Sequence, residues 1–316
     1  GQVMDHMFLD GLEDAYDAGT RGRLMGTFAE DCARRYAFSR AQQDDYALAS
    51  TRRAQQAMHE GRFDWNDRVT RYVPGLQFRS QAMTAQLKVE HLLGQNAGLV
   101  DNAFDELIEA GQTPAQILPK FQNINPRCVP GRCYGYQNVL FSQIETVLLK
   151  TTGQPYEKLM DQRIFKPLQM HTASVGYAGF LASKNRAMPH IGTRKGWAET
   201  KVVPTYYRVN PAAGVNASAS DLAQWLIAQT GHRPDVLPAP LLATLHAPVV
   251  TTPGEMRGGW RRERIHSASY ALGWRVFDYA GQQVIFHAGA VQGYRGLMAL
   301  VPGQDLGVAM VWNSDS

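Results

Sequence analysis

The 316-residue chain lacks any apolar run near the roughly 20 residues that a membrane-spanning helix requires. It also lacks a strong excess of one charge, since a formal net charge of +4 is too small to argue for a nucleic-acid partner. No P-loop, Gly-x-Gly-x-x-Gly or His-Glu-x-x-His motif occurs. We therefore expect no cofactor, no nucleic-acid partner and no membrane span. The length and the 44% hydrophobic content allow two domains, each with its own core.

Cysteine is scarce, with three in the whole chain. Cys128 and Cys133 flank the turn-forming pair Pro130-Gly131, which could bring their Cα atoms within disulfide range. Two possibilities stay open, a disulfide or two reduced thiols in a loop, because the redox compartment decides between them. No second pair of cysteines or histidines at ligand spacing accompanies them, so we expect no metal site.

The first sixty residues carry two helix-start patterns. Capping boxes at Thr27–Glu30 and Ser39–Gln42 predict helices that end near Tyr36 and Gly61. This segment resembles the loop domain of thiolases. The resemblance is carried by Gly1–Tyr16, Leu24–Ala33, Ser39-Arg40, Gln43–Ser50 and Glu60–Phe63. Thiolase chemistry needs an acylated cysteine upstream of this region and a Cys/His pair far downstream. Neither is present, so the resemblance implies a helical structural segment without thiolase activity.

From Tyr270 onward the hydrophobic residues alternate with a period of two, which is typical of strands. Two pairs of such runs are separated by the turn signals Ala280-Gly281 and Pro302-Gly303. The pattern predicts an antiparallel meander of three or four strands at the C-terminal end. Helical patterns cover about 102–110, 138–151, 155–163 and 221–230, the last with Ser220 as its expected N-cap.

Two short motifs lie in opposite halves of the chain, Tyr136-Gln137-Asn138 before an expected helix and His287-Ala288-Gly289 on an expected strand. Several further segments accompany them in a fixed order. They are Asp67–Pro74, Val89–Leu93, Ala97–Leu99, Pro130-Gly131, Thr152–Tyr156, Ile164–Met170, Ala213-Gly214, Ser218–Trp225 and His287–Ala290. Through these segments, residues 64–316 resemble the penicillin-recognising serine hydrolases, and are most similar to class C β-lactamases and their esterase and DD-peptidase relatives.

The resemblance implies a role for each motif residue. Tyr136 would be the general base of an acyl transfer, and Asn138 would hydrogen-bond the substrate amide. His287 would face the substrate carboxylate or the tyrosine hydroxyl. Gly289 would let the substrate lie close to the strand, and the backbone N–H of Ala290 would form half of an oxyanion hole. An unperturbed tyrosine has a pKa of about 10, so Tyr136 would need nearby cations to act as a base at neutral pH.

The nucleophile of such a site is missing. In the family the serine of a Ser-x-x-Lys motif is acylated by the substrate. No serine in this chain is followed three residues later by lysine. We therefore expect a β-lactamase-related serine hydrolase that is inactive as written and whose relatives act on β-lactams, D-Ala-D-Ala peptides or short esters. The alternative is a non-catalytic binding or assembly fragment, a chimera of a thiolase piece and a β-lactamase-like domain.

The expected fold class is α+β, of the β-lactamase/DD-peptidase type. We expect a thiolase-loop-like helical segment at residues 1–63 and a hydrolase domain at 64–316, helical over 64–268 and a sheet over 269–316. Relative to the family this domain is incomplete at both ends, and an exposed sheet edge or the loop segment at residues 1–63 would invite self-association. The larger part implies a periplasmic or secreted protein, although the first ten residues lack a signal-peptide layout. The expected partner is a small-molecule or peptide substrate.

Overall fold

The computed structural model describes residues 63–315 together with 13–14, 23–24, 34–35, 39 and 41. The chain divides into two compact units, Gly1–Arg62 and Phe63–Ser316. In the first unit, β1 (Glu13–Asp14) pairs antiparallel with β2 (Arg23–Leu24). The helices expected between Thr27 and Gly61 lie almost entirely outside the described residues.

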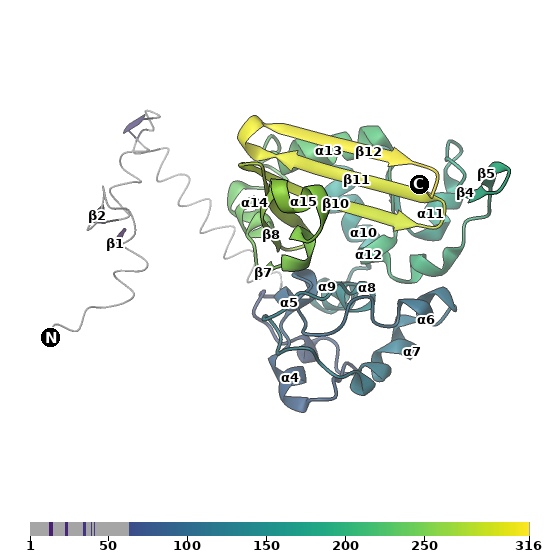
Figure 1. Ribbon diagram of the computed structural model, residues 1–316, viewed down its shortest axis with the longest axis horizontal. Helices are drawn as coiled ribbons and strands as arrows, with labels where there is room; N and C mark the ends of the chain where they lie inside the picture. Colours follow the sequence, from purple (N-terminus) through teal and green to yellow (C-terminus); the bar gives the residue numbers. More distant parts are fainter. Residues whose placement is uncertain are drawn as a thin grey trace. The chain divides into compact units, whose positions relative to one another are not determined.

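The second unit contains a six-stranded antiparallel sheet in the order β12-β11-β10-β9-β8-β7 (Figure 1). Its strands are β7 (Val250–Thr251), β8 (Ile265–Tyr270), β9 (Arg275–Tyr279), β10 (Gln282–Val291), β11 (Tyr294–Val301) and β12 (Leu306–Trp312). The expected meander is present, but the sheet begins earlier than residue 269. The sequence pattern did not predict strand β8. This strand is rich in serine and has few β-branched residues, so its intrinsic strand propensity is weak.

The hairpin between β9 and β10 turns at the residues that the sequence indicated. Ala280 and Gly281 both have positive φ, 52° and 80°, as a two-residue turn of the primed type requires. The backbone N–H of Gly281 also donates to Asp278 Oδ1 at 2.8 Å, which ties the turn to the preceding strand.

Short helices make up most of the rest of this unit. The α-helices are α4 (Gln81–Gln86), α5 (Val89–Leu93), α6 (Asp105–Glu109), α7 (Pro114–Ile117), α8 (Asn138–Phe141), α9 (Ile144–Thr152), α10 (Tyr156–Met160), α11 (Gly176–Ala182), α12 (Asn210–Ala213), α13 (Ala219–Gln229), α14 (Ala239–His246) and α15 (Gly259–Arg264). Shorter helical turns are η1 (Val69–Arg71), η2 (Leu118–Asn123), η3 (Asp161–Phe165), η4 (Pro204–Arg208), η5 (Pro253–Met256) and η6 (Pro302–Gln304). Two small antiparallel pairs join β3 (Ser174–Val175) to β6 (Val215–Asn216) and β4 (His190–Thr193) to β5 (Gly196–Glu199), and only the second pair is a hairpin.

The predicted N-cap of helix α13 is wrong: the N-cap is Ser218 and not Ser220. The Ser218 hydroxyl accepts from the Asp221 N–H at 3.2 Å, and the Asp221 carboxylate accepts from the Ser218 N–H at 2.9 Å. An aspartate at the third helical position thus completes a reciprocal capping box, which serine 220 could not do. The helix expected at 138–151 is likewise divided, into α8 and α9.

Separate apolar clusters stabilise the helical region and the sheet of this unit. Leu92, Phe121 and Val139 belong to a large cluster that joins the helices between Val69 and Val209. Helix α13 packs against β11 and β12, as Figure 1 shows, and its Leu226 is buried with Ile285 and other sheet residues. None of the helices in the described residues has the length and hydropathy of a membrane span.

Candidate functional site

The two motifs meet at one cleft. Tyr136 ends the loop that precedes α8, Asn138 is the first residue of α8, and His287, Gly289 and Ala290 lie on β10. All five residues line a cleft of about 1770 Å³, and the ring centroids of Tyr136 and His287 are 6.2 Å apart. The cleft is larger than the ~300–1,000 Å³ of a typical small-ligand site, so a small substrate would fill only part of it.

Backbone hydrogen bonds hold Tyr136 in place from both sides. Its N–H donates to Asp101 Oδ1 at 2.8 Å, and its carbonyl accepts from the N–H of Asn102 at 2.6 Å. Just before it, Gly135 lies so close to the Leu99 carbonyl that an added Cβ would be 2.1 Å from that oxygen. Glycine is therefore required at position 135 for the loop to sit against the segment at Leu99.

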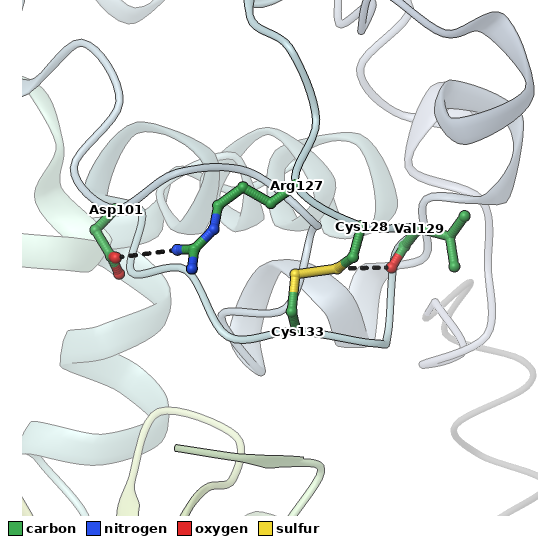
Figure 2. The surroundings of a disulfide bond; sticks show 5 residues. All are labelled: Asp101, Arg127, Cys128, Val129 and Cys133. Carbon is green, nitrogen blue, oxygen red and sulfur yellow. Dashed lines mark hydrogen bonds and ion pairs between the residues drawn. A yellow bond between two sulfur atoms is a disulfide. The ribbon is translucent and has the colours of Figure 1, made fainter. Parts of the chain in front are cut away.

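A disulfide between Cys128 and Cys133 closes the loop that leads to Tyr136, as Figure 2 shows. The two Cα atoms are 6.2 Å apart, within the usual range for a disulfide. Next to it, Arg127 Nη1 lies 3.5 Å from Asp101 Oδ2 (Figure 2). Since Asp101 also accepts from the Tyr136 N–H, the disulfide loop and the tyrosine are anchored on the same carboxylate.

At its His287-Ala288-Gly289 motif, strand β10 has a free backbone edge that faces the cleft. It pairs with β11 from Ile285 to Val291 but with β9 only from Gln282 to Phe286. Residues 287–291 thus have a strand partner on one side, and all five line the cleft. Alternate backbone N–H and C=O groups of such an edge can pair with an extended ligand. A Cβ added at Gly289 would meet no atom within 4 Å, so the space beside the strand is open.

His287 contacts a tyrosine that the sequence reading did not single out. Its Nε2 lies 3.2 Å from the hydroxyl of Tyr270, the last residue of β8. Tyr270 is 1% exposed, and its ring also contacts Tyr134 and Tyr136 at centroid distances of 5.3 and 6.5 Å. The tyrosine hydroxyl that meets His287 is therefore that of Tyr270.

Arg275 is the cation nearest to this ring cluster in the contacts that the structure shows. Its Nη1 donates to Glu255 Oε1 at 2.5 Å and its Nη2 to the Tyr134 hydroxyl at 3.1 Å. Its guanidinium carbon is 5.9 Å from the centroid of the Tyr270 ring. The charge of Arg275 is thus shared between a carboxylate and two aromatic rings.

Burial sets the protonation of the two motif side chains. It raises the pKa of Tyr136 above its usual value of 10, an effect that Arg275 opposes and Asp105 reinforces. Burial, together with the positive charge of Arg275, lowers the pKa of His287 to about 4. At neutral pH both side chains are neutral in this structure. For Tyr136 this direction is opposite to the one that a general base at neutral pH requires.

Two residues of the cleft, Tyr134 and Arg275, had no signal in the sequence motifs, and neither had Tyr270, whose ring contacts both of them. Each lies outside the two motif triplets, and each acts through contacts between segments far apart in the chain. A fourth, Asp105, accepts a hydrogen bond from Asn138 Nδ2 at 2.6 Å. Within the described residues, no group of three histidine, cysteine or acidic side chains could hold a metal ion.

The fold is of the β-lactamase and penicillin-binding-protein type. The family profile described as Beta-lactamase matches residues 48–316, which is most of the chain. The chain therefore belongs to the beta-lactamase family. A second profile, described as Thiolase, N-terminal domain, matches residues 1–67 and agrees with the resemblance of the first segment.

Curated relatives are longer than this chain. Protein flp of Staphylococcus aureus (strain NCTC 8325 / PS 47) is 23% identical over 261 residues, covering 81% of this chain and 49% of the relative. D-aminopeptidase of Gluconobacter oxydans (strain 621H) is 30% identical over 190 residues, covering 58% of this chain and 32% of the relative. The chain thus spans about half the length, or less, of these two proteins.

Solved structures share the fold. The octameric penicillin-binding protein homologue from Pyrococcus abyssi superposes with a TM-score of 0.70 at 21% identity, covering 82% of this chain and 58% of its own. D-amino acid amidase from Ochrobactrum anthropi SV3, solved with L-phenylalanine amide, gives a TM-score of 0.61 at 20% identity, covering 79% and 69%. The predicted fold class, helices with a C-terminal antiparallel sheet of the β-lactamase/DD-peptidase type, is confirmed.

Removal of the disulfide should destabilise the second unit modestly. The closed loop is short, so we expect a loss of about 2 kcal/mol in the free energy of unfolding for the double variant C128S/C133S. Denaturant unfolding with and without a thiol reductant measures it. Reductant should lower the stability of the parent protein to that of the double variant and leave the variant unchanged. Three free thiols in the denatured, unreduced parent would contradict the disulfide.

Acid should destabilise the protein partly through His287. Its pKa is about 4 in the folded state and 6.5 in the unfolded reference, so the unfolded state binds more protons between these values. The contribution is present above pH ~6.5 and is lost as the pH falls toward 4, by at most about 3–4 kcal/mol. His287→Gln should flatten that part of the stability profile relative to His266→Gln, an exposed position on β8. Equal profiles for the two variants would show that His287 is not the group responsible.

Proposed function

We propose that residues 63–316 form the substrate-binding part of an acyl-transfer site, of the class C-like and DD-peptidase-like type, without turnover of its own. The observation that carries this proposal is the meeting of Tyr136, Asn138 and the β10 motif at one cleft. The packing of the fold does not by itself require tyrosine, asparagine and histidine from opposite halves of the chain to meet at one cleft. The order of the motifs and their common cleft support the same reading.

In this site each residue has a separate task. Asn138 contacts the amide of the substrate, and Gly289 leaves room for it beside the edge of β10. The Ala290 N–H belongs to the stretch without a second strand partner and serves as an oxyanion donor. Tyr136 is the base once a cation lowers its pKa. No residue of the chain supplies the Ser-x-x-Lys nucleophile, so no acyl group can be held.

We propose short amides as the substrate class, ahead of β-lactams and D-Ala-D-Ala peptides. The relatives named D-aminopeptidase and D-amino acid amidase support this choice. The electrostatics of β10 support it too, because His287 is neutral at neutral pH and offers no permanent charge to a substrate carboxylate. A compound that carries its carboxylate at that position would lose the charge-assisted hydrogen bond that a lysine would make.

A second function, assembly, is favoured by one feature of the sheet. In the described part of the chain, β12 is an edge strand that pairs only with β11. Its side chains at Leu306, Val308, Met310 and Trp312 are 39–47% exposed, and the strand contains no charged residue and no proline. Such an edge lacks the features that prevent pairing with another chain. We propose that β12 pairs with a second copy of itself; the Pyrococcus abyssi homologue, which shares the fold, is octameric.

We expect no turnover and no covalent adduct with a chromogenic cephalosporin, a p-nitrophenyl ester, a fluorescent penicillin or D-phenylalanine amide. Removing the nucleophile of a triad-type site costs on the order of 10⁶ in rate. Intact-mass measurement and product assays after long incubation test this. A stoichiometric adduct mapped to any serine of the chain would show that another residue acts as the nucleophile.

The cleft should nevertheless bind D-phenylalanine amide reversibly, and Gly289→Val should abolish this binding. The added side chain meets no protein atom at Cβ but occupies the space beside β10, so stability should change by less than about 1 kcal/mol. Calorimetric titration measures the affinity. Gly303→Val, at an equally open glycine in η6 outside the cleft, is the matched control. Unchanged affinity in Gly289→Val would place the ligand elsewhere.

Self-association through β12 should weaken when a charge is placed on the strand. Val308→Lys is expected to reduce the association constant at least tenfold, since it would place a charge on each of the two edge strands, and such charges prevent edge pairing. Sedimentation equilibrium over a range of protein concentrations measures it. Val203→Lys, at a valine that is 50% exposed and far from the sheet in sequence, is the control. A parent protein that stays monomeric at about 100 μM would contradict the proposal.

A further inference from the structure

Asn138 is fixed in the cleft by a residue that belongs to neither motif. Its Nδ2 donates to Asp105 Oδ2 at 2.6 Å. Asn138 opens α8 and Asp105 opens α6, so each side chain projects from the first residue of a helix. Both residues line the cleft.

This hydrogen bond determines which way the Asn138 amide faces. Turning the amide over would set its oxygen against the Asp105 oxygen at a hydrogen-bond distance, which brings two acceptors together. The NH₂ group is therefore held toward Asp105, and the carbonyl oxygen Oδ1 is the acceptor left for a ligand. Burial raises the pKa of the Asp105 carboxyl group, and the hydrogen bond from Asn138 opposes this rise.

The surroundings of Asp105 favour a positively charged donor. Among the described residues, none of the ion pairs includes Asp105, and its second oxygen, Oδ1, is buried without a hydrogen-bond partner. Glu109, one turn further along α6, accepts from the Tyr206 hydroxyl at 2.9 Å. The acidic groups of α6 thus give this end of the cleft a negative potential that no described cation neutralises by a direct contact.

We propose that Asp105 is a positioning residue that turns the carbonyl oxygen of Asn138 toward the substrate, so that the site selects amides with a free α-ammonium group. This inference rests on the proposed function and deepens it by naming the group that is recognised. The chemistry is a charge-assisted N–H···O hydrogen bond from the ammonium to Asn138 Oδ1, with the negative charge of Asp105 behind it. An amide that lacks the amine can offer this oxygen only its neutral amide N–H groups, which form weaker hydrogen bonds than an ammonium does.

The test compares two ligands that differ in one group, D-phenylalanine amide and 3-phenylpropanamide, by calorimetric titration of the full chain. We expect the parent protein to bind the amine-bearing ligand at least tenfold more tightly, the ratio that a hydrogen bond to a charged group supports. In Asp105→Asn the new side chain can itself donate to Asn138, so the amide loses its fixed orientation. The selectivity ratio should fall to within about threefold.

Glu109→Gln is the matched control, because it removes a charge from the same helix without touching Asn138. It should keep most of the selectivity. An equal loss in Glu109→Gln and Asp105→Asn would overturn the proposal, since the preference would then come from overall charge. Equal binding of both ligands to the parent protein would also overturn it while leaving the proposed function intact. Failure of both ligands to bind would refute the proposed function and the inference together.

A second measurement on the parent protein keeps the test independent of the variant's folding. The side-chain NH₂ signals of Asn138 should exchange slowly with solvent, both in the free protein and with D-phenylalanine amide bound, because Asp105 holds that group. Addition of the ligand should leave this protection unchanged. Loss of protection on binding would mean that the NH₂ group turns to the ligand, and would contradict the assigned orientation.

Discussion

The cleft depends on the buried side chain of Tyr270, because this side chain contacts both the loop before α8 and strand β10. From the end of β8 its ring packs against Tyr134 and Tyr136 of the helical side. Its hydroxyl reaches His287 Nε2 on β10. A tyrosine that is 1% exposed must place its hydroxyl against polar partners, and His287 and Gln95 are two of them. Tyr270, Tyr136 and His287 thus contact one another pairwise, with ring centroids 6.2–6.5 Å apart.

The same packing determines the electrostatics. Excluding water from the ring cluster disfavours any charge that lacks a close partner, so Tyr136 and His287 are both neutral. Arg275 alone opposes this for the tyrosine, and its guanidinium is already bound to Glu255 and Tyr134. A phenolate at Tyr136 needs a second cation. In a Ser-x-x-Lys motif the lysine is such a cation and the serine is the nucleophile, so one missing motif removes both the acyl carrier and the means of activating the base.

The sequence alone predicts those features that depend on local pattern. Period-two alternation predicted the strands after Tyr270, and the Ala280-Gly281 pair predicted their hairpin, because turn geometry is set by adjacent residues. Residues that act through distant contacts gave no signal. Arg275 and Asp105 are ordinary strand and helix residues until the fold brings Tyr134 and Asn138 to them. Strand β8 and the N-cap of α13 were misplaced for a related reason. The local sequence favours neither outcome strongly at these two places. Pairing with β9 makes residues 265–270 a strand, and the carboxylate of Asp221 makes Ser218 the N-cap.

The contacts within the cleft separate binding from chemistry. Asn138, held by Asp105, and the open space at Gly289 act on a bound ligand in its ground state, and both are supported by residues of this chain. The base and the oxyanion donor act only as a transition state forms, and each depends on a partner from a Ser-x-x-Lys segment. Interactions that favour substrate and transition state equally cannot accelerate a reaction. We therefore propose that this fold acts as a binding site, and that the orientation of the Asn138 amide selects its ligand.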